Sequence, residues 1–202
     1  MHSTILITSS NKSEFDLKAT TAFSLVNEWL NTNFLRINLS KTHFMQFTRS
    51  NKHKSYLPTT HLNKQIKSVS NTKFLGIYIN ETFNWKNHID HILPKLSVAC
   101  HAMRIIKPYM SLETLRMVYH STFHSVISYC LPFCGTSPQS KRVFLMQKRI
   151  IRIVLGRTRL ASCRTLFKHL KILPLMSQYI FSIMMLIIKQ NIILQLIQQF
   201  II

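Results

Sequence analysis

The spacing of apolar residues predicts a chain that is rich in strands before residue 85 and helical after it. An amphipathic helix is expected over about residues 14–31, with Ser13 and Asp16 at its capped start. Around it, β-prone runs predict four short strands, at residues 3–8, 42–48, 64–69 and 74–79, with a polar, basic loop at residues 49–60. Gly76 lies inside the last run, where a glycine is typical of a bulge or of close approach by another backbone or a ligand.

From Trp85 onward the apolar period is helical, and prolines or a glycine mark the helix ends. Four helices are predicted, at residues 85–106, 112–131, 140–155 and 162–170. The pattern indicates an α+β fold. We expect an antiparallel sheet with one packed helix in residues 1–84, an all-α region in residues 85–178 and an apolar C-terminal segment in residues 179–202.

The C-terminal segment is apolar enough to raise the question of a membrane span. Its longest run without a charge or an amide is Tyr179 to Ile188, which is much shorter than the roughly 18–20 residues that a bilayer core needs. Lys189 and Gln190 follow directly and are costly in lipid. We interpret the segment as a core helix with an extension, and we do not expect a membrane partner.

Lys41 stands where the helical period gives way to strand alternation. Asn38 and Thr42 lie on either side of it, and such side chains bond to nearby backbone and end helices. The sequence therefore predicts a helix, a turn that carries a cation, and a half-buried strand. By composition alone, an ordinary exposed lysine is an equal interpretation of Lys41.

The charge balance changes the picture from a generic α+β protein to one with a polyanionic partner. The chain has 26 Lys and Arg against 6 Asp and Glu, a net charge of +20, which favours nucleic acid. Ten of these cations and no acid lie between Lys141 and Lys171, whereas a merely solvated face mixes signs. The candidate contacts to a nucleic-acid backbone are Lys141, Arg142, Lys148, Arg149 and Arg152.

The acidic residues do not form a catalytic pair. Glu14 and Asp16 lie in the first turn of the predicted helix, where negative charge complements the helix dipole. The other four acids are scattered and have the pattern of solvated positions. The three glycines form neither a GxGxxG nor a GxxxxGK[ST] loop, which excludes those two kinds of nucleotide site. The sequence therefore predicts no independent two-metal active site.

Histidines and cysteines give no convincing metal site either. His88 and His91 share a helical face, but no second pair with ligand spacing accompanies them. Cys130 and Cys134 are separated by Pro132, which we expect to break the helical geometry between them. We interpret all four cysteines as reduced thiols of an intracellular protein, in the cytoplasm or the nucleus.

Taken in order, several short motifs resemble the reverse transcriptases of non-LTR, LINE-type retrotransposons such as the jockey-like elements. The first is NxLxxNxxKTxxxxF from Asn33 to Phe47, followed by FLG at Phe74, Leu75 and Gly76. Then come WxxH at Trp85 and His88, Tyr119 with Ser121, and the run QKRIIR at residues 147–152. The ordered set covers nearly all of residues 3–185 and is specific, although each motif alone is weak.

The resemblance implies a role for several residues. Lys41 would belong to the palm's motif D, near the phosphates of the incoming nucleotide, and Phe74, Leu75 and Gly76 to the primer grip. The helices after Trp85 would form the thumb, which holds an RNA template and a DNA primer. The intact family uses Mg²⁺ held by aspartates, and alignment of the strand at residues 3–8 places the Asp-Asp pair on Met1 and His2.

The resemblance therefore implies a 5′-truncated open reading frame that carries the C-terminal palm and the thumb. We expect the chain to bind nucleic acid without polymerising it, with no catalytic residue and no metal or other cofactor of its own. The alternative is a non-enzymatic, basic RNA- or DNA-binding module retained by a host. A cooperative thermal unfolding transition of soluble monomer would favour that alternative, and aggregation would favour a decayed relic.

Overall fold

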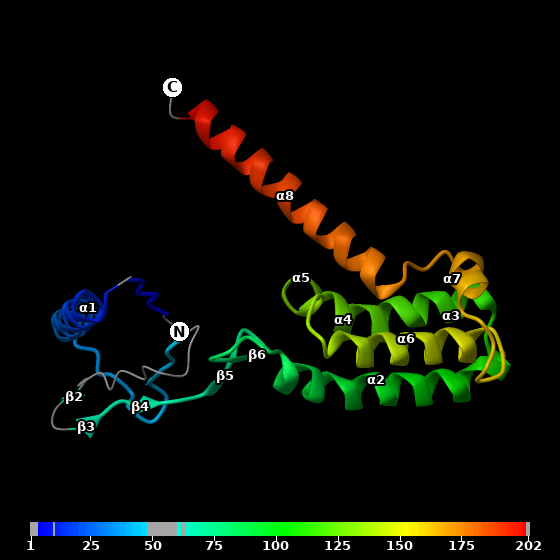
Figure 1. Ribbon diagram of the computed structural model, residues 1–202, viewed down its shortest axis with the longest axis horizontal. Coiled ribbons are helices and arrows are strands. Elements are labelled where there is room, and N and C mark those ends of the chain that lie inside the picture. Colours follow the sequence, from blue (N-terminus) through cyan, green and yellow to red (C-terminus); the bar gives the residue numbers. More distant parts are fainter. Residues whose placement is uncertain (1–3, 10, 48–59, 62–63, 201–202) are drawn as a thin grey trace. The chain divides into compact units, whose positions relative to one another are not determined.

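The computed structural model describes residues 4–9, 11–47, 60, 61 and 64–200, and it has a mixed α+β composition (Figure 1). Its contacts divide it into two compact units. The N-terminal unit contains the described residues up to Lys73 together with Asn80–Phe83. The helical unit contains Phe74–Ile79 and everything described from Asn84 onward. The division thus runs through a β-hairpin, whose tip belongs to the helical unit.

Helix α1, Lys12–Thr32, confirms the helix predicted in the N-terminal unit. Its cap differs from the prediction, because the side chain of Asn11 accepts the N–H of Ser13 at 3.2 Å. Asparagine is well suited to this position since its short side chain reaches the free N–H groups of the first turn. Apart from Lys12, whose burial is not described, Ala19 is the only buried residue of α1.

The strands of the N-terminal unit are shorter than predicted. Strand β1, His43–Phe44, pairs in parallel with β4, Lys67–Ser68, and β2, Thr60–His61, pairs antiparallel with β3, Lys64–Gln65. The expected antiparallel pairing was therefore wrong for β1 and β4, which pair in parallel. The predicted run at residues 64–69 is split between β3 and β4.

Residues 4–9 form no regular secondary structure, so the strand predicted at residues 3–8 is wrong over its described part. A β-prone run becomes a strand only where a neighbour completes its hydrogen bonds, and none pairs with this one among the described residues. The end of the strand predicted at 42–48 and all of the loop predicted at 49–60 except Thr60 lie outside the described residues.

Strands β5, Asn71–Phe74, and β6, Ile77–Asn80, form a hairpin. The prediction of a single strand over residues 74–79 was wrong, because Leu75 and Gly76 are the two turn residues of the hairpin. Both have positive φ, 46° and 81°, as a type I′ hairpin turn requires. A glycine inside an apolar run can mark either a bulge or a turn, and the pairing of the flanking residues decides which.

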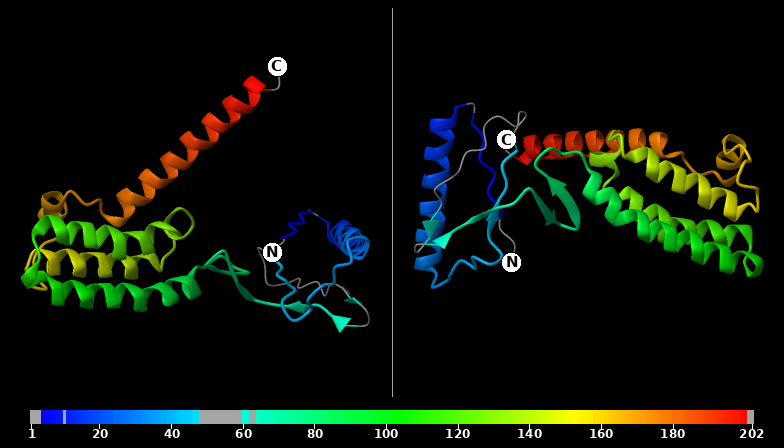
Figure 2. Two further views of the ribbon diagram at one scale, coloured as in Figure 1. Left: turned by 180° about the vertical axis from the view of Figure 1, so that it is seen from behind. Right: turned by 60° about the horizontal axis from the view of Figure 1, so that its bottom comes forward.

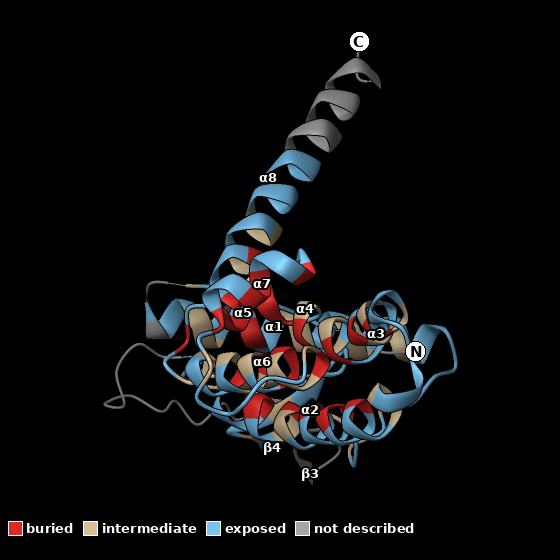
Figure 3. Cartoon of the chain, turned by 90° about the vertical axis from the view of Figure 1, so that its right-hand side faces the viewer, coloured by how far each residue is buried: buried red, intermediate tan, exposed pale blue. Residues whose placement is uncertain are grey.

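The helical unit is built around the packing of α2, Lys86–Ile106, against α6, Ser140–Val154, and both helices were predicted (Figure 2). Its other elements are η1, Lys107–Tyr109, α3, Leu112–Val118, α4, Ser125–Ser128, α5, Leu131–Cys134, α7, Arg164–Leu170, and α8, Leu175–Phe200. One continuous core joins them, and the buried residues lie on the facing sides of the helices (Figure 3). Ile89, Leu96, Met103, Phe123 and Ile150 are completely buried in this core.

The single helix predicted at residues 112–131 is interrupted. A π-helix, Tyr119–His124, joins α3 to α4, and its Tyr119 and Phe123 are buried in the core with their ring centroids 5.5 Å apart. The chain then breaks before α5, whose first turn contains Pro132. Proline is tolerated there because the first turn of a helix needs no N–H at that position.

Helix α8 is a core helix only at its start. Leu175 and Gln178 are buried, whereas residues 184–190 are exposed although most of them are apolar. Within the described part of the chain, no single helix has both the length and the apolar character of a membrane span. Helix α7 together with residues 175–190 of α8 meets those two criteria as a pair bent by 50°.

Candidate nucleic-acid interface

A buried glutamine fixes how α6 is rotated in the helical unit. The Gln147 side chain is completely buried, and its Nε2 donates to the Tyr119 hydroxyl and to the Leu173 carbonyl, both at 3.0 Å. Its Oε1 accepts the N–H of Leu175 at 2.9 Å. Burial raises the pKa of Tyr119 to about 12, so this hydroxyl stays protonated. The opposite side of α6 is thereby held outward, and it carries the cations.

The predicted cations on this outward side of α6 form two rows. Residues seven apart share a helical face, so Lys141 and Lys148 form one row and Arg142 and Arg149 another. Lys148 and Arg152 line a surface pocket. Arg149 is exposed, and its charge opposes the rise that burial causes in the pKa of the Cys100 thiol, to about 11.

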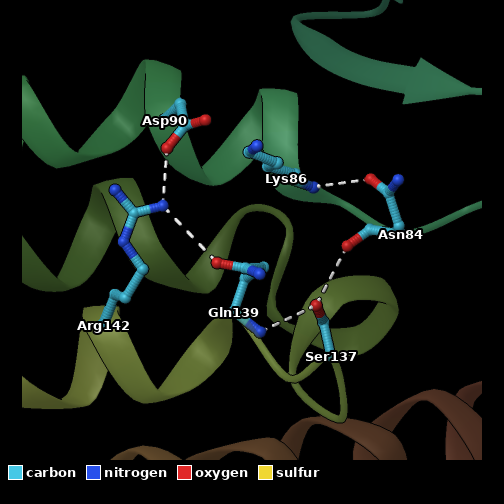
Figure 4. Close-up of polar contacts among 6 residues, drawn as sticks. All are labelled: Asn84, Lys86, Asp90, Ser137, Gln139 and Arg142. Atoms are coloured by element: carbon cyan, nitrogen blue, oxygen red, sulfur yellow. Dashed lines mark hydrogen bonds and ion pairs between the residues drawn. The ribbon is translucent and has the colours of Figure 1, made fainter.

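Arg142 is already engaged with an acid. Its Nη1 donates to Asp90 Oδ1 of α2 at 2.6 Å (Figure 4). Gln139 Oε1 lies 3.5 Å from the same nitrogen, and the Gln139 N–H donates to Ser137 Oγ. The Ser137 hydroxyl in turn donates to the Asn84 carbonyl at 3.1 Å. Asp90 therefore offsets part of the charge that the sequence assigned to a nucleic-acid backbone.

The surface pocket has a volume of about 450 Å³ and lies between α6, α7 and the segment of residues 160–163. Its lining combines cations with aromatic rings, and it contains no acid. The cations are Lys148, Arg152 and Arg164, and the rings are Phe144 and Phe167.

Two contacts hold the pocket's α6 side in place. Arg152 Nε donates to the Ala161 carbonyl at 2.9 Å. Lys148 Nζ lies 4.4 Å from the centroid of the Phe144 ring, within the range of a cation–π contact. The rings of Phe144 and Phe167 stack with centroids 6.3 Å apart. Lys148 and Arg152 are thus held by contacts within the protein rather than left free on long side chains.

Lys41 lies at an exposed turn of the N-terminal unit, between α1 and β1. The N–H of Lys41 and the hydroxyl of Thr42 both donate to the Asn38 carbonyl, at 3.0 and 2.9 Å. Asn38 Oδ1 accepts from the backbone and side chain of Ser40. The local bonding by Asn, Ser and Thr that the sequence predicted is therefore present.

Phe74, Leu75 and Gly76 form the tip of the β5–β6 hairpin, within the helical unit. The Tyr129 hydroxyl donates to the Leu75 carbonyl. A side chain at Gly76 would meet the Tyr129 ring at 3.6 Å. The neighbour of Gly76 is thus a tyrosine side chain of the helical unit, whereas the sequence suggested another backbone or a ligand.

His88 and His91 are structural in the described chain. His88 is buried, and its Nδ1 accepts the Tyr78 N–H at 3.4 Å, while the His91 ring packs on Tyr78. Burial, helped by the charges of His91 and Lys95, lowers the pKa of His88. No group of three or more metal-ligating side chains occurs among the described residues.

The four cysteines are free and buried. The break of helical geometry predicted at Pro132 was wrong. Residues Leu131–Cys134 form the helix α5, and the Cys134 N–H donates to the Cys130 carbonyl at 3.0 Å. A hydrogen bond to the Cys134 thiol and burial both raise the pKa of Cys130. This thiol is therefore a poor nucleophile.

Sequence reasoning missed three residues of the pocket, Phe144, Arg164 and Phe167. Phe144 precedes Lys148 by four positions, so its place on the cationic face was open to detection. Arg164 and Phe167 lie beyond two turns of non-helical chain. Only the packing of α7 on α6 brings these two residues to the pocket, and no local sequence pattern predicts that packing.

Three comparisons with known proteins bear on this chain. No protein-family model matches it, and no curated protein or solved structure is significantly similar to it.

Proposed function

We propose that this chain carries the C-terminal palm and the thumb of a non-LTR retrotransposon reverse transcriptase, and that it binds nucleic acid without polymerising it. The observation that carries the binding is the acid-free pocket on α6 and α7, lined by Lys148, Arg152 and Arg164. The motif resemblance supplies the family, and the charge of +20 supplies the class of partner.

Phosphate binding fits the pocket cations better than the rest of α6. Lys148 and Arg152 are one helical turn apart and open onto the same pocket as Arg164. Arg142 contributes less, because Asp90 lies 2.6 Å from its Nη1. Each cation that neutralises a phosphate releases condensed counterions, so the affinity should fall steeply as salt rises.

We do not propose polymerisation, because the carboxylates of this chain are scattered along the sequence. Glu14 pairs with Lys18 on α1 at 2.6 Å, and Asp90 pairs with Arg142 on α2. All six acidic residues belong to the described chain, and the proposal rests on their spacing in the sequence, which offers no pair suited to clamp two metal ions. In this proposal Lys41 faces nucleotide phosphates and Phe74–Gly76 grips a primer, roles that depend on carboxylates supplied from elsewhere.

The test is the salt dependence of binding to a 20-nucleotide single strand, followed by fluorescence polarisation. The double variant Lys148→Gln/Arg152→Gln should make the slope of log K against log salt shallower, by the equivalent of about one to two phosphate contacts. The matched control, Lys18→Gln/Arg142→Gln, removes the same charge from two cations that are already ion-paired and should change the slope by less than half as much. Equal changes in the two variants, or no salt-dependent binding by the parent chain, would contradict the proposal.

The absence of polymerase activity is tested separately by primer extension. The purified chain is given a primed RNA template, deoxynucleotides and either Mg²⁺ or Mn²⁺. We expect no extension above background. Template-directed incorporation that survives repurification of the chain would overturn this part of the proposal.

A non-enzymatic binding module is the second candidate, favoured by one observation. The helical unit has a continuous core of its own, in which Leu96, Phe123 and Ile150 are fully buried. A unit with such a core can fold and bind without the rest of a polymerase. Cooperative unfolding of soluble monomer would support this candidate.

A further inference from the structure

We propose that the pocket between α6 and α7 receives one nucleotide of a single-stranded nucleic acid, with the base against Phe144 and the phosphate on Lys148, Arg152 and Arg164. The inference rests on the proposed nucleic-acid binding, and it adds which form of nucleic acid is preferred and which residues read it. The sequence indicated Lys148 and Arg152 as phosphate contacts, but not the pocket that they share with Phe144 and Arg164.

The size and lining of the pocket favour a nucleotide. About 450 Å³ lies within the roughly 300–1,000 Å³ typical of sites for small ligands. The lining offers an apolar side, from Phe144 and Phe167, and a cationic side on the same pocket. A nucleotide has the same two parts, a flat base with an apolar face and an anionic phosphate.

The same geometry disfavours a duplex as the occupant. In a duplex the base faces are stacked inside and only the backbone and the base edges are presented, so no base face reaches a ring in a pocket. A single strand can turn a base outward and stack it on an aromatic side chain. The Phe144 ring is partly exposed, as a stacking partner must be, whereas Phe167 is buried and supports it from behind.

The cations are arranged for a phosphate rather than spread over a surface. Arg152 is anchored through its Nε to the Ala161 carbonyl, which restricts the orientation of its guanidinium group. Arg164 is the first residue of α7 and lines the same pocket. Two arginines from different elements thus open onto one pocket, and planar guanidinium groups suit phosphate oxygens.

Lys148 connects the two halves of the site. In the ligand-free chain its Nζ lies over the Phe144 ring at 4.4 Å. A base that stacks on the exposed face of this ring displaces the ammonium group, which is then available to the phosphate of the same nucleotide. Stacking and phosphate binding are therefore coupled through one side chain, and each should weaken when the other is removed.

The experiment measures binding of fluorescein-labelled eight-nucleotide oligo(dT) and oligo(rU), and of a 20-base-pair duplex, to the full chain. The variants are Phe144→Leu, which keeps an apolar side chain, and Arg164→Gln. The matched controls are Phe133→Leu, at an exposed ring outside the pocket, and Arg159→Gln, at an exposed arginine outside it. Thermal unfolding followed by circular dichroism verifies that each variant is folded.

Phe144→Leu and Arg164→Gln should each weaken single-strand binding about fivefold or more, and duplex binding less than twofold. The controls should change either affinity less than twofold. The proposed nucleotide site would be wrong if a variant weakened single-strand and duplex binding equally, or if Arg164→Gln and Arg159→Gln weakened binding equally. Either result would indicate general electrostatic binding only. If the parent chain binds neither ligand, the proposed function fails with it. If Phe144→Leu unfolds the chain, the comparison of Arg164→Gln with Arg159→Gln still tests the proposal, because both arginines are exposed.

Similar losses for oligo(dT) and oligo(rU) are expected, because stacking on a ring and contact with a phosphate do not involve the 2′-hydroxyl. The coupling through Lys148 is tested by the double variant Phe144→Leu/Lys148→Gln. Its loss should be smaller than the product of the two single losses, whereas independent contributions would multiply.

Discussion

Helices α1 and α2 have the same length, 21 residues each, but only one of them is integrated into a core. Seven residues of α2 are buried, with Ile89, Leu96 and Met103 completely so. In α1 the only buried residue among those described is Ala19, while Leu17, Leu25 and Trp29 are more than half exposed. Most helix stability in proteins comes from the packing of an apolar face, so the partner α6 gives α2 a stability that the largely exposed α1 lacks.

The polar contacts of the two units differ in the same way. In the helical unit, Gln147 joins residues 28 and 26 positions away in the chain and is fully buried. In the N-terminal unit, Asn38 bonds to Ser40 and Thr42, within the same exposed turn. Local, exposed bonds compete with water at little net gain, whereas buried bonds specify one arrangement. The helical unit should therefore be the stable part of the chain.

The largest expected effect comes from emptying the core of α2. Leu96→Ala should lower the free energy of unfolding of the helical unit by about 3–5 kcal/mol, because it removes a fully buried side chain and leaves a cavity. The matched variant Leu25→Ala, on the exposed side of α1, should change it by less than about 0.5 kcal/mol. Urea unfolding followed by circular dichroism measures both. Comparable losses would show that α1 is packed as firmly as α2.

A smaller effect is expected from the buried glutamine. Gln147→Met keeps the volume but leaves the Tyr119 hydroxyl, the Leu173 carbonyl and the Leu175 N–H without this partner, at a cost of about 2–3 kcal/mol. The comparison variant Asn38→Ala removes bonds that water replaces and should cost less than about 1 kcal/mol. If Gln147→Met were neutral in urea unfolding, α6 would be held by its apolar face alone.

The smallest effect concerns pH. Burial, with the charges of His91 and Lys95, lowers the pKa of His88 below that of an unfolded histidine, so near pH 6 the unfolded chain binds more protons. Acidification from pH 7 to pH 5 should therefore reduce the free energy of unfolding, by up to about 1.4 kcal/mol per pH unit below pH 6.5. His88→Gln keeps an acceptor for the Tyr78 N–H and should flatten this dependence. An unchanged pH dependence of urea unfolding in the variant would count against a buried, neutral His88.

The helices of the helical unit were predictable where one face of the sequence is apolar over several turns. Helices α2 and α6 lie within one residue of the predicted bounds at both ends. The helix predicted at residues 112–131 was too simple, because the local apolar pattern shows neither the π-helix at Tyr119–His124 nor the break before α5. The strand predicted at residues 3–8 was wrong over its described part, since strand formation requires a partner that the local sequence does not specify.

The candidate site shows the same division. The row of Lys148 and Arg152 followed from helical spacing alone, because residues four apart on a helix are neighbours. That Arg142 is paired with Asp90, 52 positions away, followed only from the packing of α2 against α6. The pocket likewise depends on α7, whose Arg164 joins the cations of α6 through tertiary contacts.

The sequence by itself determined the composition of the protein: a strongly basic chain, an acid-free run from Lys141 to Lys171, and helices where the apolar period is 3.6 residues. These are local or summed properties, so each is complete before the chain folds. Only the tertiary structure decided which cations are offset by an acid, which ones share a pocket with Phe144, and which of two equally long helices is buried. Those outcomes depend on contacts between residues far apart in the chain, and no window of sequence contains both partners.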